Sequence, residues 1–189
     1  VVDLNRAMFE GYPGFIKKMQ VDGITIYGID IPYSNKMGVP RRLASFFLFM
    51  VAACFSTLSV RSVDMVFATS TPPTIAVPAL FCKYARNVPF VFELRDIWPD
   101  FVEQLGVLPG VPKSVFRFID FCITRIYHRA DAVTTTTPGM TEIIAKKGVG
   151  RDKLNTILLG ANCGIYQDKS LPHRVLNEPA LKGKFVVGF

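Results

Sequence analysis

The amino-acid sequence predicts an α/β fold, in which a parallel β-sheet carries helices on both faces. Two patterns predict it. Short apolar runs rich in β-favouring residues alternate with longer runs of helical periodicity, and glycine, proline or hydroxyl residues separate them. This alternation is typical of parallel sheets joined by right-handed crossovers. The 189 residues, 50% of them hydrophobic, are enough to bury the core of one such domain.

The strands are expected at intervals along the chain. Ile24, Ile26, Ile29 and Ile31 alternate loosely with other residues, which indicates a strand within residues 23–31 that has one buried face. The later strands are short and apolar. We expect them at residues 63–68, 90–94, 130–137 and 153–159.

Helices are expected between these later strands. Residues 74–86 form an apolar stretch of helical length, and residues 111–129 repeat apolar side chains with a period close to that of an α-helix. A third helix is expected to start at Pro138 and to end near Lys147, because proline suits the first helical turn and a glycine follows the last one.

The stretch from Leu43 to Val60 contains no charged residue and follows Arg41 and Arg42. It reaches the length of about 18 residues that marks a candidate membrane span. We favour a buried helix of a layered α/β domain, because serine and threonine dilute the stretch and a strand pattern follows at once. A membrane span and an interfacial helix, with the two arginines bound to lipid phosphates, are the alternatives.

Both ends of the chain suggest a fragment. The chain starts at Val1 and stops within the apolar run 184–189, and a proline-containing segment of mixed charge precedes that run. We therefore expect one domain at residues 1–166, with its first strand truncated. Residues 167–189 would be a linker and the first strand of a second domain.

The composition limits the partners. The net charge of +7 and the sequence pI of about 9.4 favour solubility or anionic partners such as phosphate groups and acidic lipids. No run of lysine and arginine is dense enough to indicate nucleic acid. The 4 cysteines lack C-x-x-C spacing, so neither a metal site nor a disulfide framework is predicted. Reduced, buried thiols fit a cytoplasmic protein.

Polar residues follow three of the predicted strands at the point where each strand ends. The carboxyl ends of parallel strands meet at one edge of a sheet, which is where α/β proteins bind ligands. The strand at residues 90–94 leads directly into an arginine and an aspartate, close to the only tryptophan. The residues expected at this edge are Thr69, Ser70, Thr71, Arg95, Asp96, Trp98, Thr135, Thr136 and Thr137.

Arg95 and Asp96 are the candidate catalytic pair. A guanidinium group presents a fixed fork of donors that matches phosphate or carboxylate groups. A carboxylate suits the hydroxyl groups of a sugar, and the ring of Trp98 suits its apolar face. The structural alternative is an arginine–aspartate pair that only holds the loop, with Trp98 in the core.

His128 and His173 are not persuasive general bases, and no phosphate-binding or dinucleotide-binding glycine motif is present.

Four segments, taken in order, resemble one known family. They are DMVFATSTPP at 64–73, FVFELRDIWP at 90–99, ADAVTTTTPGM at 130–140 and the stretch from GV to LLGAN at 148–162. Together they resemble the N-terminal domain of bacterial family-four glycosyltransferases of the GT-B fold. The nearest resemblance is to sugar transferases of capsule, O-antigen and colanic-acid assembly, such as L-fucosamine transferases. The resemblance implies a Rossmann-like domain on the acceptor side, with the donor held mainly by a second domain.

The resemblance also implies an activity. It implies a retaining, hexosyltransferase-type enzyme that moves sugar from a nucleotide-sugar to a lipid-linked saccharide in lipopolysaccharide or exopolysaccharide synthesis. It implies a cytoplasmic enzyme, with the inner face of the cytoplasmic membrane as a peripheral site, and no metal or other cofactor. The present fragment is expected to be inactive alone.

Residue roles follow from the same resemblance. Arg95 and Asp96 would be catalytic, although many relatives have histidine at the first position. Leu158 stands where proline is usual, and Asn162 stands where aspartate is usual. The implied acceptor-binding residues are Thr69, Ser70, Thr71, Trp98, Thr136 and Thr137. The implied hinge or cleft residues are Gly160 and Asn162.

Two other functions remain open at this point. One is a different nucleotide-handling α/β enzyme, such as an epimerase or a dehydrogenase, which would need a glycine fingerprint upstream of the present sequence. The other is a non-enzymatic protein anchored in a membrane through residues 43–60.

Overall fold

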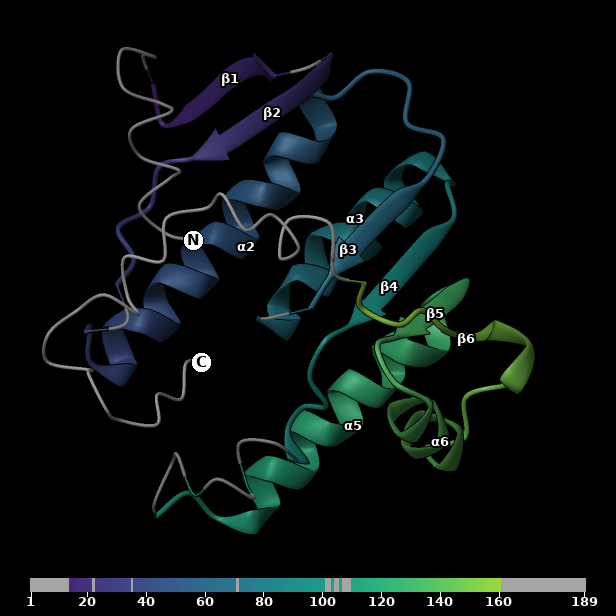
Figure 1. The fold of residues 1–189 in the computed structure, drawn as a ribbon. Helices are drawn as coiled ribbons and strands as arrows, with labels where there is room; N and C mark the ends of the chain where they lie inside the picture. The colour runs from purple at the N-terminus through teal and green to yellow at the C-terminus, as the bar shows by residue number, and fades with distance from the viewer. Residues whose placement is uncertain are drawn as a thin grey trace, which may run out of the picture. The chain divides into compact units, whose positions relative to one another are not determined.

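The computed structural model describes residues 14–21, 23–34, 36–70, 72–100, 103, 106 and 110–160. The chain divides into two units after Leu158, and nearly all the described residues belong to the first (Figure 1). The predictions for the first strand, Thr71, Asn162, Cys163 and the segment 167–189 lie outside the described residues.

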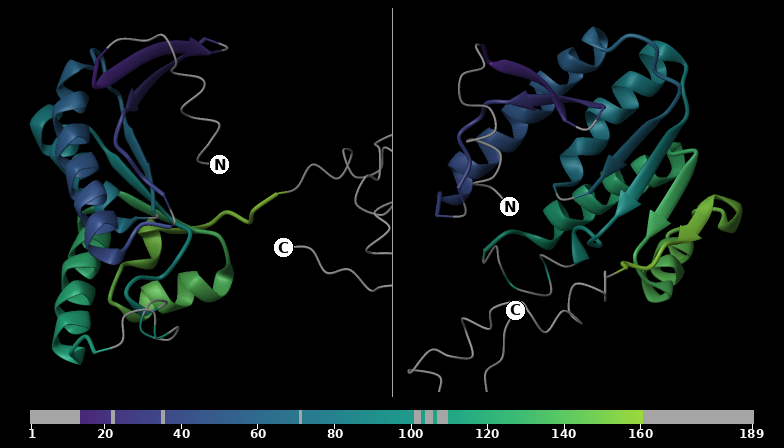
Figure 2. Two further views of the ribbon diagram at one scale, coloured as in Figure 1. Left: turned by 90° about the vertical axis from the view of Figure 1, so that its left-hand side faces the viewer. Right: turned by 45° about the horizontal axis from the view of Figure 1, so that its top comes forward.

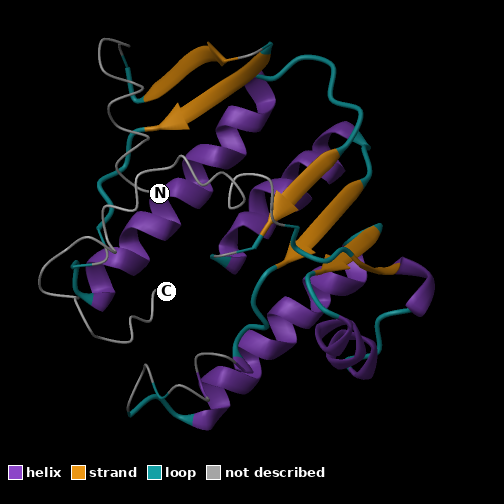
Figure 3. Cartoon of the chain, in the orientation of Figure 1, coloured by secondary structure: helices purple, strands orange, loops and turns teal. Residues whose placement is uncertain are grey.

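A four-stranded parallel sheet forms the centre of the first unit, as Figure 3 shows. The strands lie side by side in chain order, and neighbouring strands are parallel throughout. They are β3 (Val66–Thr69), β4 (Phe90–Leu94), β5 (Ala132–Thr135) and β6 (Leu154–Thr156). The predicted α/β architecture, a parallel sheet flanked by helices, is confirmed.

Three helices connect these strands in turn, close to where the sequence predicts them. They are α3 (Ala76–Arg86), α5 (Lys113–Arg129) and α6 (Pro138–Lys146). α3 ends at Asn87, which adopts the left-handed conformation with φ 54°. The side chain of Thr137 caps α6 by accepting a hydrogen bond from the Met140 amide.

Alternate residues of β4 build the core. Phe90, Phe92 and Leu94 are buried, whereas Val91 and Glu93 between them are only partly covered. Successive side chains of a strand point to opposite faces, so the core residues share one face of the sheet. The Phe92 ring lies 5.7 Å from that of Phe90 and 6.1 Å from that of Tyr127 in α5. Side chains of α3 and α6 complete the same cluster.

A separate β-hairpin precedes the parallel sheet. β1 (Ile16–Val21) pairs antiparallel with β2 (Ile24–Ile29), and the turn between them contains Gly23 at φ 81°. The strand predicted within residues 23–31 is present. Its antiparallel partner was not predicted, because the alternation of lysine and apolar residues from Ile16 onward is weak.

The uncharged stretch forms a long helix, α2 (Val39–Ser59), which packs beside α3 (Figure 2). Our expectation that this helix is buried is wrong. Only Ala52 and Ser56 are buried, and the large side chains Phe47 and Phe55 are 63% and 65% exposed. Among the described residues, α2 is the one helix long and apolar enough to cross a membrane by length and composition.

Asp131 ties three elements together at the start of β5. Its carboxylate accepts hydrogen bonds from the Phe90 amide at 2.7 Å and from Lys83 Nζ at 2.7 Å. The hydrogen bond from Lys83 is the main reason why the pKa of Asp131 lies below its ordinary value, and burial opposes this shift. The stabilisation is therefore complete above the pKa of the unfolded carboxyl and is lost as the pH falls through the folded value.

We expect Asp131→Asn to lower the free energy of unfolding by about 1 kcal/mol at neutral pH, because the charge that attracts Lys83 is lost. The difference from wild type should shrink as the pH falls from about 7 to about 3. Urea unfolding at several pH values measures both effects. Asp64→Asn, at an exposed position, is the control. A difference that stays constant with pH would contradict the role of the charge.

Candidate functional site

The carboxyl ends of β3 and β4 are joined by one buried serine. The Ser70 amide donates a hydrogen bond to the Glu93 carbonyl at 2.8 Å, and the Ser70 hydroxyl accepts one from the Arg95 amide at 2.9 Å. Ser70 is 2% exposed. It therefore fixes the point at which Arg95 leaves the sheet, and its hydroxyl is already engaged in that task.

Arg95 emerges at this edge with its side chain largely in solvent. The side chain is 57% exposed, and its Nε lies 3.3 Å from Glu93 Oε2. Residues two apart on a strand share a face, so Glu93 and Arg95 lie on the face opposite Phe92 and Leu94. Among the described residues, Glu93 is the acidic partner of this guanidinium, and it accepts a hydrogen bond from Nε.

The residues after Arg95 turn back towards the core. Asp96 is half-buried. Trp98 packs against the buried cluster, as the structural alternative expected, and its Nε1 is buried with no hydrogen-bond partner among the described residues. Its ring is thus engaged in packing on at least one side.

A lysine links this loop to two helices. Lys147 Nζ lies 3.4 Å from Asp100 Oδ2 and forms a shorter ion pair with Asp120 of α5. The same two carboxylates act on Tyr127, whose pKa is raised by burial and, to a lesser degree, by the charges of Asp120 and Asp100. The phenol of Tyr127 therefore stays protonated and serves packing.

The threonines at the end of β5 are used mainly within the fold. Thr135 is buried, and its hydroxyl lies 2.5 Å from that of Thr141, which lies 2.6 Å from that of Thr156. Thr136 donates to the sulfur of Met140, while Thr137 caps α6. The acceptor-binding role of Thr136 and Thr137 stays a prediction, as does that of the half-buried Thr69.

Sequence reasoning missed a row of polar residues that crosses the sheet. In the strand register, Glu93 lies between Thr69 and Thr134, and Thr134 lies next to Asn155. The row lies on the same face as Arg95. Thr134 is 7% exposed, and its hydroxyl has no hydrogen-bond partner among the described residues. Glu93 could have been found from the sequence, because it lies two residues before Arg95 and alternate residues of a strand share a face.

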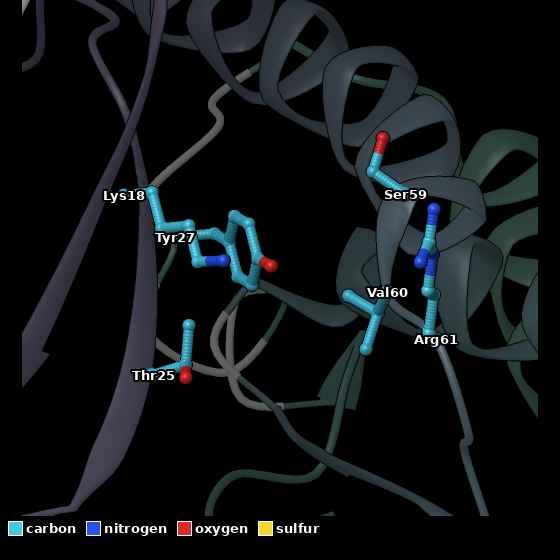
Figure 4. Close-up of a pocket in the computed structure, with 6 residues that line it drawn as sticks. All are labelled: Lys18, Thr25, Tyr27, Ser59, Val60 and Arg61. Carbon is cyan, nitrogen blue, oxygen red and sulfur yellow. The ribbon is translucent and has the colours of Figure 1, made fainter.

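A pocket lies elsewhere, between the hairpin and the end of α2 (Figure 4). It has a volume of about 540 Å³ and contains none of the predicted site residues. Its lining residues are Lys18, Thr25, Tyr27, Ser59, Val60 and Arg61.

The described residues contain no candidate metal site. No three histidine, cysteine or acidic residues gather there in a way that could hold a metal ion. Cys54, Cys82 and Cys122 have free thiols, and burial raises the pKa of Cys54. Gly160 is exposed at the end of the described residues.

A comparison with models of protein families finds a match for most of the chain. Residues 9–160 match a family model described as a glycosyl transferase 4-like domain. A search of curated proteins finds no match.

Proposed function

The chain belongs to the family of glycosyl transferase 4-like domains, and from this premise we propose that it forms the acceptor side of a retaining glycosyltransferase. The enzyme would transfer a hexose-type sugar from a nucleotide-sugar to a lipid-linked saccharide in bacterial surface polysaccharide synthesis. The free thiols of the described cysteines agree with the cytoplasm, where we place the reaction.

The exposed Arg95 at the edge of the sheet is the observation that supports this proposal most. Departure of a nucleoside diphosphate leaves negative charge on phosphate oxygens, and a donor fixed in advance stabilises such charge without reorganising during the reaction. Glu93 holds Arg95 through Nε, so the remaining two NH₂ groups can contact two oxygen atoms together. We assign Arg95 to the leaving diphosphate and Glu93 to the orientation of Arg95.

Acceptor hydroxyl groups need hydrogen-bonding partners beside this arginine. Asp96 follows Arg95 directly, and we assign it the orientation of the reactive hydroxyl. The row of Thr69, Glu93, Thr134 and Asn155 adds further donors and acceptors on the same face. Ser70, whose hydroxyl holds the Arg95 amide, becomes a positioning residue in this assignment. Contributions of Thr71, Trp98, Gly160 and Asn162 remain part of the proposal.

A transfer assay with the complete enzyme tests the reaction. A panel of nucleotide-sugars is incubated with polyprenyl-diphosphate saccharides, and release of nucleoside diphosphate is followed together with the anomeric configuration of the product by NMR. We expect release that depends on the acceptor and a product that keeps the configuration of the donor. An inverted product would contradict the retaining mechanism, and release independent of any acceptor would contradict sugar transfer.

A further inference from the structure

The helix α2 exposes large apolar side chains that an ordinary surface helix would bury. A surface helix of a soluble domain puts its apolar side chains inward and its polar side chains into water. In α2 the two buried residues, Ala52 and Ser56, are small, and Phe46 is half-buried against Tyr33, whereas several other large apolar residues are exposed. The outward residues recur at helical spacing and form what we call the α2 face: Leu43, Phe47, Leu48, Phe55 and Leu58.

The polar groups of α2 are satisfied locally. The Ser56 hydroxyl donates to the Ala52 carbonyl at 2.8 Å, and the Thr57 hydroxyl donates to the Cys54 carbonyl at 2.7 Å. Ser45 donates to the Pro32 carbonyl at 2.8 Å, which binds the helix to the preceding loop. The α2 face can therefore move from water into an apolar environment while these side chains keep their hydrogen bonds.

Exposed apolar side chains also occur on α3, the neighbour of α2. The two helices pack side by side, and Arg86 of α3 donates hydrogen bonds to the Thr57 and Leu58 carbonyls at 3.0 and 2.8 Å. α3 exposes Phe81 and Tyr84 on its own outer side. Large exposed apolar side chains that recur along one side of a whole helix are uncommon on a soluble monomer and indicate a surface that binds something apolar.

Positive charge borders the α2 face at both ends. Arg41 and Arg42 lie in the first turn of α2, and Arg61 lies two residues beyond its last residue, Ser59. At that second end the pocket in Figure 4 brings Lys18 and Arg61 together with the hydroxyls of Thr25, Tyr27 and Ser59. No acidic residue occurs between Asp30 and Asp64. Arginine and lysine next to an apolar helix face complement the phosphate groups of an anionic lipid surface.

We propose that the α2 face is a docking surface for an anionic phospholipid bilayer, with α2 lying in the plane of that surface. The helix then buries its outer phenylalanines among the acyl chains, while the arginines at its two ends contact headgroup phosphates. A second copy of the chain fits this face less well, because a symmetric contact would bring the same arginines towards each other. A span fits less well, because α2 would have to leave its contacts with Arg86 and Pro32.

Vesicle flotation with the full chain tests the proposal. Vesicles of phosphatidylcholine alone are compared with vesicles that contain phosphatidylglycerol, and Phe47→Glu/Phe55→Glu is compared with Ile157→Glu, a control at another exposed apolar position. We expect binding to the anionic vesicles only. The double variant should weaken binding about tenfold or more, as should Arg41→Glu/Arg42→Glu, and the control should bind as wild type does. Circular dichroism checks that every variant is folded.

Three outcomes would overturn the proposal. Equal binding to neutral and anionic vesicles would show that the arginines do not contribute to binding. Unchanged binding of the folded double phenylalanine variant would show that the α2 face is not the surface that binds the vesicles. Resistance of the bound protein to carbonate extraction would show a span in place of surface docking. None of these outcomes depends on sugar transfer, so the proposed docking surface and the proposed reaction are tested independently of each other.

Discussion

Arg95→Lys in the complete enzyme is expected to lower kcat for sugar transfer about 100-fold while the domain stays folded. Lysine keeps the charge but replaces the planar fork by a single ammonium group, so two phosphate oxygens can no longer be held together. Loss of one preorganised donor to a developing negative charge typically costs a factor of about 100 to 1,000 in kcat. Initial rates at saturating donor and acceptor measure this effect.

The stability of this variant should hardly change, because the Arg95 side chain is 57% exposed and its ion pair with Glu93 is open to solvent. Arg151→Lys is the matched control. Arg151 is an exposed arginine that also pairs with a glutamate, Glu142, but it is not one of the residues placed at the strand ends. Glu93→Gln should lower kcat less than Arg95→Lys does, since the arginine remains. Wild-type activity of Arg95→Lys would refute the site assignment.

Phe92→Ala is expected to destabilise the domain by about 3–5 kcal/mol, the usual cost of removing a buried aromatic ring. Phe92 is 0% exposed and lies between Phe90 and Tyr127 at the centre of the cluster. Small domains are stable by only about 5–15 kcal/mol, so a large share of the total would be lost. Chemical unfolding followed by circular dichroism measures the change.

Phe67→Ala provides a control with the same change in the neighbouring strand. Phe67 is 53% exposed and lies next to Val91, on the other face of the sheet from Phe92. Its loss should cost less than about 1 kcal/mol, because little apolar area leaves the interior. Equal effects of the two substitutions would mean that the core does not lie on the Phe92 face.

The sequence predicts where the candidate site lies better than it predicts which residues form it. Arg95 follows a buried apolar strand and precedes a proline, so local pattern alone indicates that it lies at a strand end. Glu93 looks like part of that strand, and its pairing with Arg95 becomes visible only with the side chains in place. Thr134 and Asn155 are distant in the chain from Glu93, and the register of three strands brings them into line with it.

By itself, the sequence determined the parallel α/β domain, its later strands and helices, and the exit of Arg95 from β4, because these follow from periodicity and from residues that end elements locally. Tertiary structure alone decided that α2 exposes its phenylalanines, that Ser70 holds the Arg95 amide and that Trp98 packs on the core. The physical reason is that apolar composition favours burial of a helix, but only the packing of neighbouring elements determines which side of the helix is buried in the domain and which side stays exposed.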